Sequence, residues 1–348
     1  MGPIEDQTKD NREDAGPIVA PHLISVVVPV YKGETTLESL LAEMSPLTSV
    51  TLSPSGTPFK VEEVLLVFDN GPDRSAEVIR MLKSKYDFVR DVWLSRNFGQ
   101  HSATLAGMAS SGSEWIVTLD EDGQHDPRDI GKLLDAALAK NSSLVYARPT
   151  NSAPHGTFRN AASRLSKSLV SKLSPGQPVN DYQSFRLILG EVGRAVAAYA
   201  GAGVYLDVAL GWIASRTTTA DVELRSEGGR LSGYSQRKLL SHFWRLVLTS
   251  GTRALRLVSL LGVLLAMAGF LLGVYFIVER LLGGALPLGF TSMITVILFS
   301  SGAVLIALGV IAEYLGVAVN AAMGKPLYLI VSDPNDGPLG RRQATLAR

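Results

Sequence analysis

The stretch that decides the fold of this chain is Trp115-Ile-Val-Thr-Leu-Asp120-Glu-Asp122-Gly-Gln124-His125-Asp-Pro127. Its apolar run ends abruptly in carboxylates, and a proline that can open a helix follows. If the run is a buried parallel strand, Asp120 and Asp122 lie at its carboxyl end, where open α/β sheets bind ligands. Alternate residues of an extended segment point the same way, so the two carboxylates can face one point in space.

Two carboxylates and the amide oxygen of Gln124 are hard oxygen ligands. They suit Mg²⁺ or Mn²⁺, and such an ion usually also holds substrate phosphates. The alternative is a solvated acidic turn that caps the helix starting near Pro127. An isolated Asp-x-Asp favours this alternative, so the rest of the chain decides between the two.

Composition excludes several classes of protein. The chain has 348 residues and a formal charge of +1, which argues against a nucleic-acid partner because such proteins normally carry a strong basic excess. It has no cysteine, which excludes disulfides, thiol catalysis and cysteine-type zinc sites. Residues 1–22 are polar and acidic and lack the apolar core of a signal peptide, so we expect a disordered tail.

Two long uncharged runs predict a membrane hairpin. Residues 257–278 form a run of about 22 residues, which as a helix spans about 33 Å. Residues 290–312 form a second run of similar length. The alternative, a buried hairpin in a soluble core, fits two uncharged runs of this length poorly. Basic residues flank the two runs at Arg237, Lys238, Arg245, Arg253, Arg256, Lys325, Arg341 and Arg342.

This charge pattern predicts which side of the membrane the rest of the chain occupies. By the positive-inside rule both flanks lie in the cytoplasm, together with the large N-terminal domain and a C-terminal tail at residues 313–348. Residues 237–256 mix aromatic and basic side chains, which predicts an amphipathic helix in the membrane interface. The alternative for this segment is packing under the soluble domain.

The N-terminal part of the chain alternates apolar runs with helical patterns. We expect helices at residues 35–44, 74–85, 101–110 and 128–140, and strands at residues 23–31, 64–68, 88–94, 115–119 and 144–147. This alternation predicts an α/β fold with a parallel, doubly wound sheet. The first strand is not followed by a Gly-x-Gly-x-x-Gly motif, and the chain has no Walker loop.

Four motifs occur in the order seen in family 2 glycosyltransferases of the GT-A fold. They are Val28-Pro29-Val30-Tyr31, Asp69-Asn70-Gly71, Arg96-Asn97-Phe98-Gly99 and Asp120-Glu-Asp122-Gly-Gln124-His125. More narrowly, the chain resembles the polyprenyl-phosphate glycosyltransferases, which include dolichol-phosphate mannose synthases and bactoprenol glucosyltransferases. The resemblance covers residues 24–331, including both apolar runs. It implies a GT-A domain, Rossmann-like with a mostly parallel sheet, at residues 23–236.

The resemblance implies roles for the acidic motifs. Asp120, Asp122 and Gln124 match the family's metal and diphosphate site, in which Mg²⁺ or Mn²⁺ neutralises charge on the departing nucleoside diphosphate. Asp69 matches an acid that reads the nucleotide base, although it could instead cap the following helix. This chain departs from the family at Asn70 and Pro72, where Asp and Ser are usual.

Further residues match positions at which the family binds substrate. Asp181 could act as a base or orient Arg186; we favour orientation, because a polyprenyl phosphate is already an anionic nucleophile. Guanidinium groups suit phosphates, although a single arginine on a solvated helix face is the ordinary alternative. In the Gly/Ser-rich segment at residues 225–238 we favour Arg230 over Arg225 as the phosphate ligand. The substrate-binding residues implied are Pro29, Tyr31, Glu34, Asp69, Arg148, Arg159, Ser163, Arg186, Arg230 and Ser235.

These features predict an inverting, metal-dependent transferase at the cytoplasmic face of the inner (plasma) membrane, anchored by a multi-pass hairpin. It would move one sugar from a UDP- or GDP-linked donor to polyprenyl phosphate. Glycines in the two runs would permit close helix packing, and so a homo-oligomer. Two alternatives remain. One is a membrane-anchored nucleotide-sugar sensor without activity. The other is a polysaccharide synthase, which the absence of a Gln-x-x-Arg-Trp motif disfavours.

Overall fold

The computed structural model describes residues 20–151, 182–201, 204–225, 253–282, 289–324 and 326–336. Most of the predicted N-terminal tail and of the predicted interfacial helix lies outside these residues. Five predicted site residues also lie outside them, namely Arg159, Ser163, Asp181, Arg230 and Ser235.

One sheet organises the described part of the N-terminal domain. Its strand order is β8-β6-β7-β5-β1-β3-β4-β9, and β2 pairs with β3. Pairing is parallel among β5, β1, β3 and β4, whereas β7 lies antiparallel between β5 and β6. The strands are β1 (His22–Val30), β2 (Thr51–Leu52), β3 (Pro58–Phe68), β4 (Val89–Leu94), β5 (Trp115–Thr118), β6 (Leu144–Pro149), β7 (Arg186–Leu189), β8 (Thr217–Val222) and β9 (Ile330–Val331).

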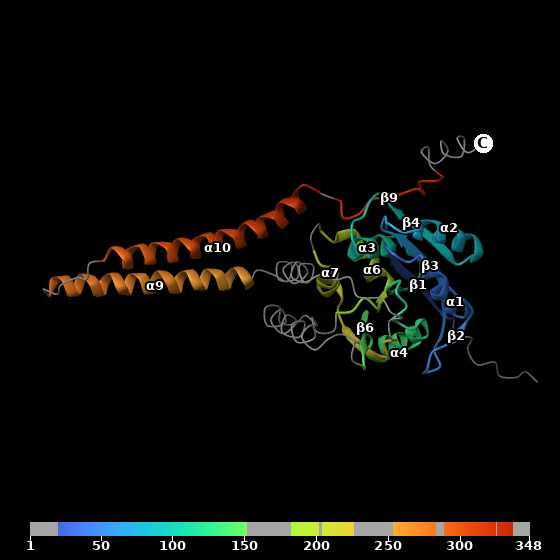
Figure 1. The fold of residues 1–348 in the computed structure, drawn as a ribbon. Coiled ribbons are helices and arrows are strands. Elements are labelled where there is room, and N and C mark those ends of the chain that lie inside the picture. The colour runs from blue at the N-terminus through green and yellow to red at the C-terminus, as the bar shows by residue number, and fades with distance from the viewer. Residues whose placement is uncertain are drawn as a thin grey trace, which may run out of the picture.

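Helices cover both faces of this sheet, as the alternating pattern predicts (Figure 1). Side chains of α1, α2 and α4 share one buried apolar cluster with the strands, and side chains of α3, α6 and α7 share the other. Strands buried on both faces need continuous apolar runs, which is what β1 and β3 contain. The helices are α1 (Leu37–Met44), α2 (Ser75–Lys85), α3 (Gln100–Ser110), α4 (Ile130–Lys140), α6 (Gly190–Tyr199) and α7 (Leu206–Ile213).

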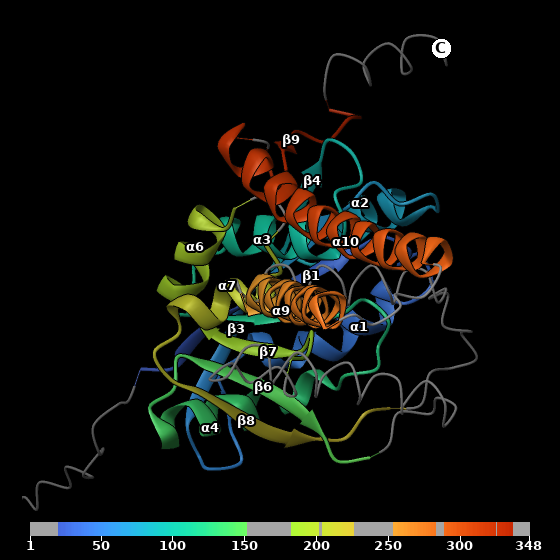
Figure 2. The ribbon, with the colours of Figure 1, turned by 90° about the vertical axis from the view of Figure 1, so that its left-hand side faces the viewer.

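Two long helices project from the folded domain as a hairpin, α9 (Arg253–Leu281) and α10 (Phe290–Ala322). They contact each other; Figure 2 looks nearly along α9, whereas α10 runs obliquely across that view. Within α10, the 21 residues Phe299–Val319 have a mean hydropathy of 2.1 and none is buried. Among the described residues this is the one segment that is long and apolar enough to cross a membrane. The apolar segment found in α9, Gly262–Leu271, is shorter.

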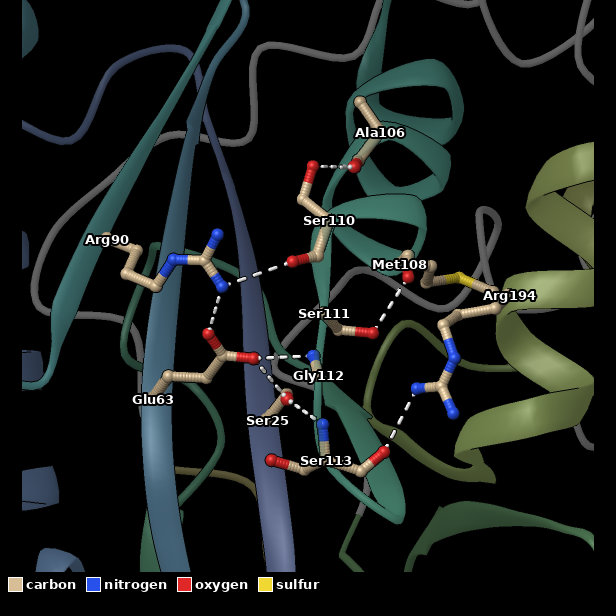
Figure 3. Close-up of polar contacts among 10 residues, drawn as sticks. All are labelled: Ser25, Glu63, Arg90, Ala106, Met108, Ser110, Ser111, Gly112, Ser113 and Arg194. Carbon is tan, nitrogen blue, oxygen red and sulfur yellow. Dashed lines mark hydrogen bonds and ion pairs between the residues drawn. The ribbon is translucent and has the colours of Figure 1, made fainter.

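A polar network joins the strands near the amino ends of β1 and β5 (Figure 3). Glu63 of β3 is buried, and it accepts hydrogen bonds from Ser25 Oγ at 2.6 Å and from the Gly112 N–H at 2.7 Å. It also forms an ion pair with Arg90 of β4. Burial raises the pKa of Glu63, but its bonds to Ser25, Arg90 and Gly112 outweigh burial and hold the pKa below its usual value.

We expect Glu63→Gln to lower the free energy of unfolding at pH 7 by about 1–3 kcal/mol. The neutral amide cannot replace the charged carboxylate as the partner of Arg90 and as the acceptor for Ser25 and Gly112. A carboxylate whose pKa is lower in the folded state stabilises the fold above its unfolded pKa, near 4.5, and this stabilisation is lost as the pH falls through the folded value. The difference between variant and wild type should therefore shrink below pH 4.5. Unfolding in detergent at pH 7 and pH 4 measures it.

The neighbouring Glu62→Gln is the matched control, since Glu62 forms a more exposed ion pair with Lys60. It should change stability little at either pH. An equal loss in the two variants, or a Glu63→Gln loss that does not depend on pH, would contradict the assigned role of Glu63.

Candidate active site

The predicted acidic residues gather at one edge of the sheet. Asp69 follows β3, and Asp120 and Asp122 follow β5. Both strands pair in parallel with β1, so their carboxyl ends meet at the same edge, next to the loop that begins at Tyr31. The structure therefore places these three acids where the sequence predicts a ligand site.

Asp120 is held from two sides. Its Oδ1 accepts a hydrogen bond from Gln100 Nε2 at 2.6 Å, and its Oδ2 accepts one from Ser184 Oγ at 2.6 Å. Burial raises the pKa of Asp120 to about 6; these two bonds oppose the shift, and the charge of Asp122 adds to it. Asp120 and Asp122 follow the same strand two residues apart, and the negative charge of Asp122 is near enough to raise the pKa of Asp120.

Gln100 is the first residue of α3, and Asp69 fixes the start of this helix. The Asp69 carboxylate accepts hydrogen bonds from the Phe98 N–H at 2.7 Å and the Gly99 N–H at 2.8 Å. Asn97 Nδ2 also donates to the Asp69 carbonyl at 3.1 Å. Asp69 is buried, which raises its pKa although both N–H groups act against this. Asp69 thus holds the two residues just before α3, and neither bond goes to α2, the helix that follows Asp69 in the chain.

Buried residues of the domain hold Ser184 in place through hydrogen bonds. Its carbonyl accepts a hydrogen bond from Thr118 Oγ1 at 2.5 Å, and Thr118 Oγ1 accepts one from Arg186 Nε at 3.0 Å. Arg186 forms a buried ion pair with Asp207, which also accepts a hydrogen bond from the Tyr146 hydroxyl at 2.9 Å. Arg186, which the resemblance assigns to substrate, is only 4% exposed and reaches Asp120 through Thr118 and Ser184.

The remaining residues of the acidic motif tie neighbouring loops to it. The Glu121 carboxylate accepts hydrogen bonds from the N–H groups of Tyr31 and Lys32, both at 2.9 Å. Asp122 Oδ1 accepts the Gln124 N–H at 3.1 Å, which closes a tight turn. His125 is buried and its ring lies 4.9 Å from that of Phe185, so His125 is not a surface residue.

Arg225 connects the end of the β8 segment to the same motif. Its N–H donates to the Gln124 carbonyl at 2.9 Å. Its guanidinium pairs with Glu43 at 2.6 Å and with Asp126 at 2.7 Å. Arg225 therefore holds the loop that contains Gln124, which differs from the phosphate binding that the resemblance implies for Arg230.

The other predicted substrate residues that the structure describes lie in different surroundings. Arg148 forms an exposed ion pair with Asp221 at 2.7 Å. Glu34 accepts the Arg74 N–H at 3.0 Å. Tyr31 is 43% exposed at the site edge, and Pro29 is buried within β1.

Sequence reasoning missed four residues that build this site, and each left a weak signal. Gln100 directly follows the Arg96–Gly99 motif, and Ser184 lies inside the segment that contains Asp181 and Arg186. Glu121 is the middle residue of the acidic motif, and Arg225 lies in the same Gly/Ser-rich segment as Arg230.

The described residues contain no group of three or more His, Cys, Asp or Glu side chains that could hold a metal ion. Two close carboxylates and one amide remain as donors. Mg²⁺ and Mn²⁺ are often bound by one or two carboxylates, with water and substrate phosphates completing the shell, so this donor set fits such an ion.

Comparison with known proteins matches this description. A model of glycosyl transferase family 2 matches residues 25–194. An undecaprenyl-phosphate 4-deoxy-4-formamido-L-arabinose transferase of Pseudomonas paraeruginosa is 32% identical over 88% of this chain and 89% of its own length. A protein with the same description from Photorhabdus laumondii subsp. laumondii is 30% identical over 88% of this chain and 93% of its own length.

A solved structure, glucosyl-3-phosphoglycerate synthase of Mycobacterium tuberculosis, aligns with a TM-score of 0.48 and 19% identity over 67% of this chain and 79% of that one. The chain thus belongs to glycosyl transferase family 2, is a glycosyltransferase, and has the mostly parallel α/β sheet of the GT-A fold.

Proposed function

We propose that this enzyme transfers a single sugar from a UDP- or GDP-linked donor to polyprenyl phosphate, with inversion at the anomeric carbon. The observation that carries the proposal is the position of Asp120, held by Gln100 and Ser184 beside Asp122 at the ligand-binding edge of the sheet. Relatives that are named as undecaprenyl-phosphate transferases support the choice of acceptor.

Asp120, Asp122 and Gln124 are the residues that would hold Mg²⁺ or Mn²⁺. Asp120 already directs both oxygens at hydrogen-bond donors, so its place is fixed before any ion binds. A bound divalent ion supplies a positive charge that stabilises the departing nucleoside diphosphate. The protein's own part is to hold these oxygens in one arrangement, so that little reorganisation is needed during the reaction.

The acceptor needs little activation. A phosphate oxygen of the lipid attacks the anomeric carbon, and the bond from that carbon to the nucleoside diphosphate breaks with its electron pair on the departing oxygen. The attacking oxygen is already anionic near neutral pH, so we assign Asp181 to orientation rather than to proton abstraction. Holding donor and acceptor side by side supplies much of the rate gain.

The donor site uses Asp69 and its neighbours. Each oxygen of Asp69 accepts one backbone N–H, and a carboxylate oxygen has a second lone pair with which to accept from a nucleotide base. We keep the following residues as proposed substrate contacts: Pro29, Tyr31, Glu34, Arg148, Arg159, Ser163, Arg230 and Ser235. We propose that Arg186 positions Asp120 indirectly, through Thr118 and Ser184.

The membrane arrangement follows from the hairpin. We propose that α9 and α10 both cross the inner (plasma) membrane, that residues 237–256 lie in its interface, and that the catalytic domain is cytoplasmic. The hairpin also supports a homo-oligomer. A Cβ added at Gly302, Gly309 or Gly316 meets nothing within 4 Å, so these glycines, at heptad spacing along α10, leave one face of the helix open.

Transfer of labelled sugar from a panel of nucleotide sugars to undecaprenyl phosphate tests this function. The panel includes UDP- and GDP-linked hexoses and a nucleotide-linked 4-deoxy-4-formamido-L-arabinose. With Mn²⁺ or Mg²⁺ we expect one lipid-linked sugar from one donor, and no product with EDTA. Asp122→Asn should lower the rate by about 100-fold or more, because charge stabilisation of the leaving group is lost.

Asp87→Asn is the control, since Asp87 is an exposed acid before β4, and it should transfer at the wild-type rate. Binding of a donor without transfer to any lipid phosphate would contradict the proposal and favour a membrane-anchored sensor. A product that carries many sugars would favour a polysaccharide synthase.

Ser184→Ala tests the support of Asp120. We expect kcat to fall by about 10- to 100-fold and the Mn²⁺ concentration for half-maximal rate to rise, because an outer partner of a metal-site carboxylate is lost. Ser184→Thr keeps the hydroxyl and should restore most of the rate.

Ser84→Ala removes an exposed hydroxyl of α2 and should change neither quantity. If Ser184→Ala keeps the wild-type metal dependence, Ser184 does not support the metal site.

A further inference from the structure

The segment that follows the membrane hairpin returns to the catalytic sheet. The hairpin lies in the chain between β8 and β9, and these two strands form opposite edges of the sheet. Residues 323–329 connect the end of α10 to β9, and a chain of this length reaches about 25 Å at most. The hairpin is therefore attached to the domain at both of its ends, and its second attachment is short.

Main-chain contacts hold this returning segment against β4. Ile330 and Val331 pair antiparallel with Leu94 and Trp93, and the Leu329 carbonyl accepts the Ser95 N–H at 3.0 Å. A strand of two residues makes too few hydrogen bonds to stay in place alone. Further contacts must fix it.

The ion pair between Arg80 and Asp333 supplies these further contacts. The buried Asp333 accepts hydrogen bonds from Arg80 of α2, at 2.6 Å from Nε and 2.7 Å from Nη2. This two-pronged geometry is the most specific that arginine offers a carboxylate. The Arg80 guanidinium lies 4.8 Å from the centre of the Trp93 ring, and the Asn335 N–H donates to Asp333 Oδ1 at 2.9 Å.

The segment around β9 also lies next to the candidate active site. Ser95 begins the loop whose Phe98 and Gly99 N–H groups bind Asp69 and which presents Gln100 to Asp120. Leu327 and Tyr328 pack on the same apolar cluster as Phe98. The short connection thus links the end of α10, through β9, to the edge of the sheet beside the site.

We propose that residues 326–336 act as a clasp that fixes the orientation of the catalytic domain on the membrane hairpin, with Arg80 and Asp333 as its positioning residues. The clasp keeps the site facing an acceptor that cannot leave the bilayer, so this inference rests on the function proposed above. The competing account is that β9 only covers the edge of β4.

A distance measurement tests the clasp without relying on activity. The chain has no cysteine, so Ser84→Cys on α2 and Ala312→Cys on α10 can carry two spin labels without removing native thiols. Doubly labelled full-length protein, diluted with unlabelled protein in lipid nanodiscs, should give a narrow distance distribution by pulsed electron paramagnetic resonance. Asp333→Ala should broaden it, and the exposed Asp336→Asn should not. Equal distributions in all three proteins would overturn the clasp.

Lengthening the connection between α10 and β9 tests the orientation of the catalytic domain separately from its stability. The insertion leaves the Arg80–Asp333 ion pair intact. Insertion of Gly-Ser-Gly-Ser after Met323 should lower transfer to undecaprenyl phosphate by about tenfold or more, since small misplacements of reacting groups are costly. Nucleotide binding measured by calorimetry and the unfolding temperature should stay at wild-type values. Transfer at the wild-type rate by this variant would overturn the orienting role. If wild type itself transfers nothing, the proposed function fails, while the spin-label distances still decide the clasp.

Discussion

The two hydrogen bonds that Asp120 accepts are the constraint on which the site depends. One comes from Gln100 at the start of α3, and the other comes from Ser184 in the segment before β7. Asp69 positions Gln100, because it binds the two residues just before α3. The buried ion pair of Arg186 and Asp207 positions Ser184, because Arg186 donates to Thr118 and Thr118 donates to the Ser184 carbonyl. Buried polar groups are costly unless they are satisfied, so each member of this network fixes the next. The protein thereby holds the Asp120 carboxylate in place although burial and the negative charge of Asp122 raise its pKa.

The sequence predicts those parts of the fold and of the candidate site that depend on residues close together in the chain. The alternation of strands and helices and the position of Asp120 at a strand end follow from short patterns, and the structure confirms them. The partners of Asp120 do not follow, because Ser184 is 64 residues away and nothing in the local pattern pairs the two. Likewise β7 enters the sheet antiparallel between β5 and β6, and strand order is not a local property. A strand as short as β9 has no periodicity to detect, and its clasp joins residues 253 positions apart.

The fold joins one catalytic sheet to a long apolar helical hairpin. In the function that we propose, the edge of the sheet would bind two anionic substrates, and the hairpin would limit where that edge can point. Because α10 presents apolar side chains with none buried over Phe299–Val319, this part of the hairpin contributes little to the domain's core. Its orientation therefore depends on how the chain is attached at each end. The proposed site and the proposed clasp are adjacent, because Ser95 bonds to Leu329 and begins the loop whose Phe98 and Gly99 bond to Asp69.

The central claim is that Asp120 and Asp122 form the metal and diphosphate site. The most direct measurement is an anomalous difference map, recorded at the manganese edge, from crystals of the full-length protein grown with Mn²⁺ and UDP. The account predicts one strong peak between the Asp120 and Asp122 carboxylates and the nucleotide diphosphate, with the Gln100 and Ser184 hydrogen bonds retained. A peak bound to other side chains, or a diphosphate bound at this edge without any manganese, would contradict it.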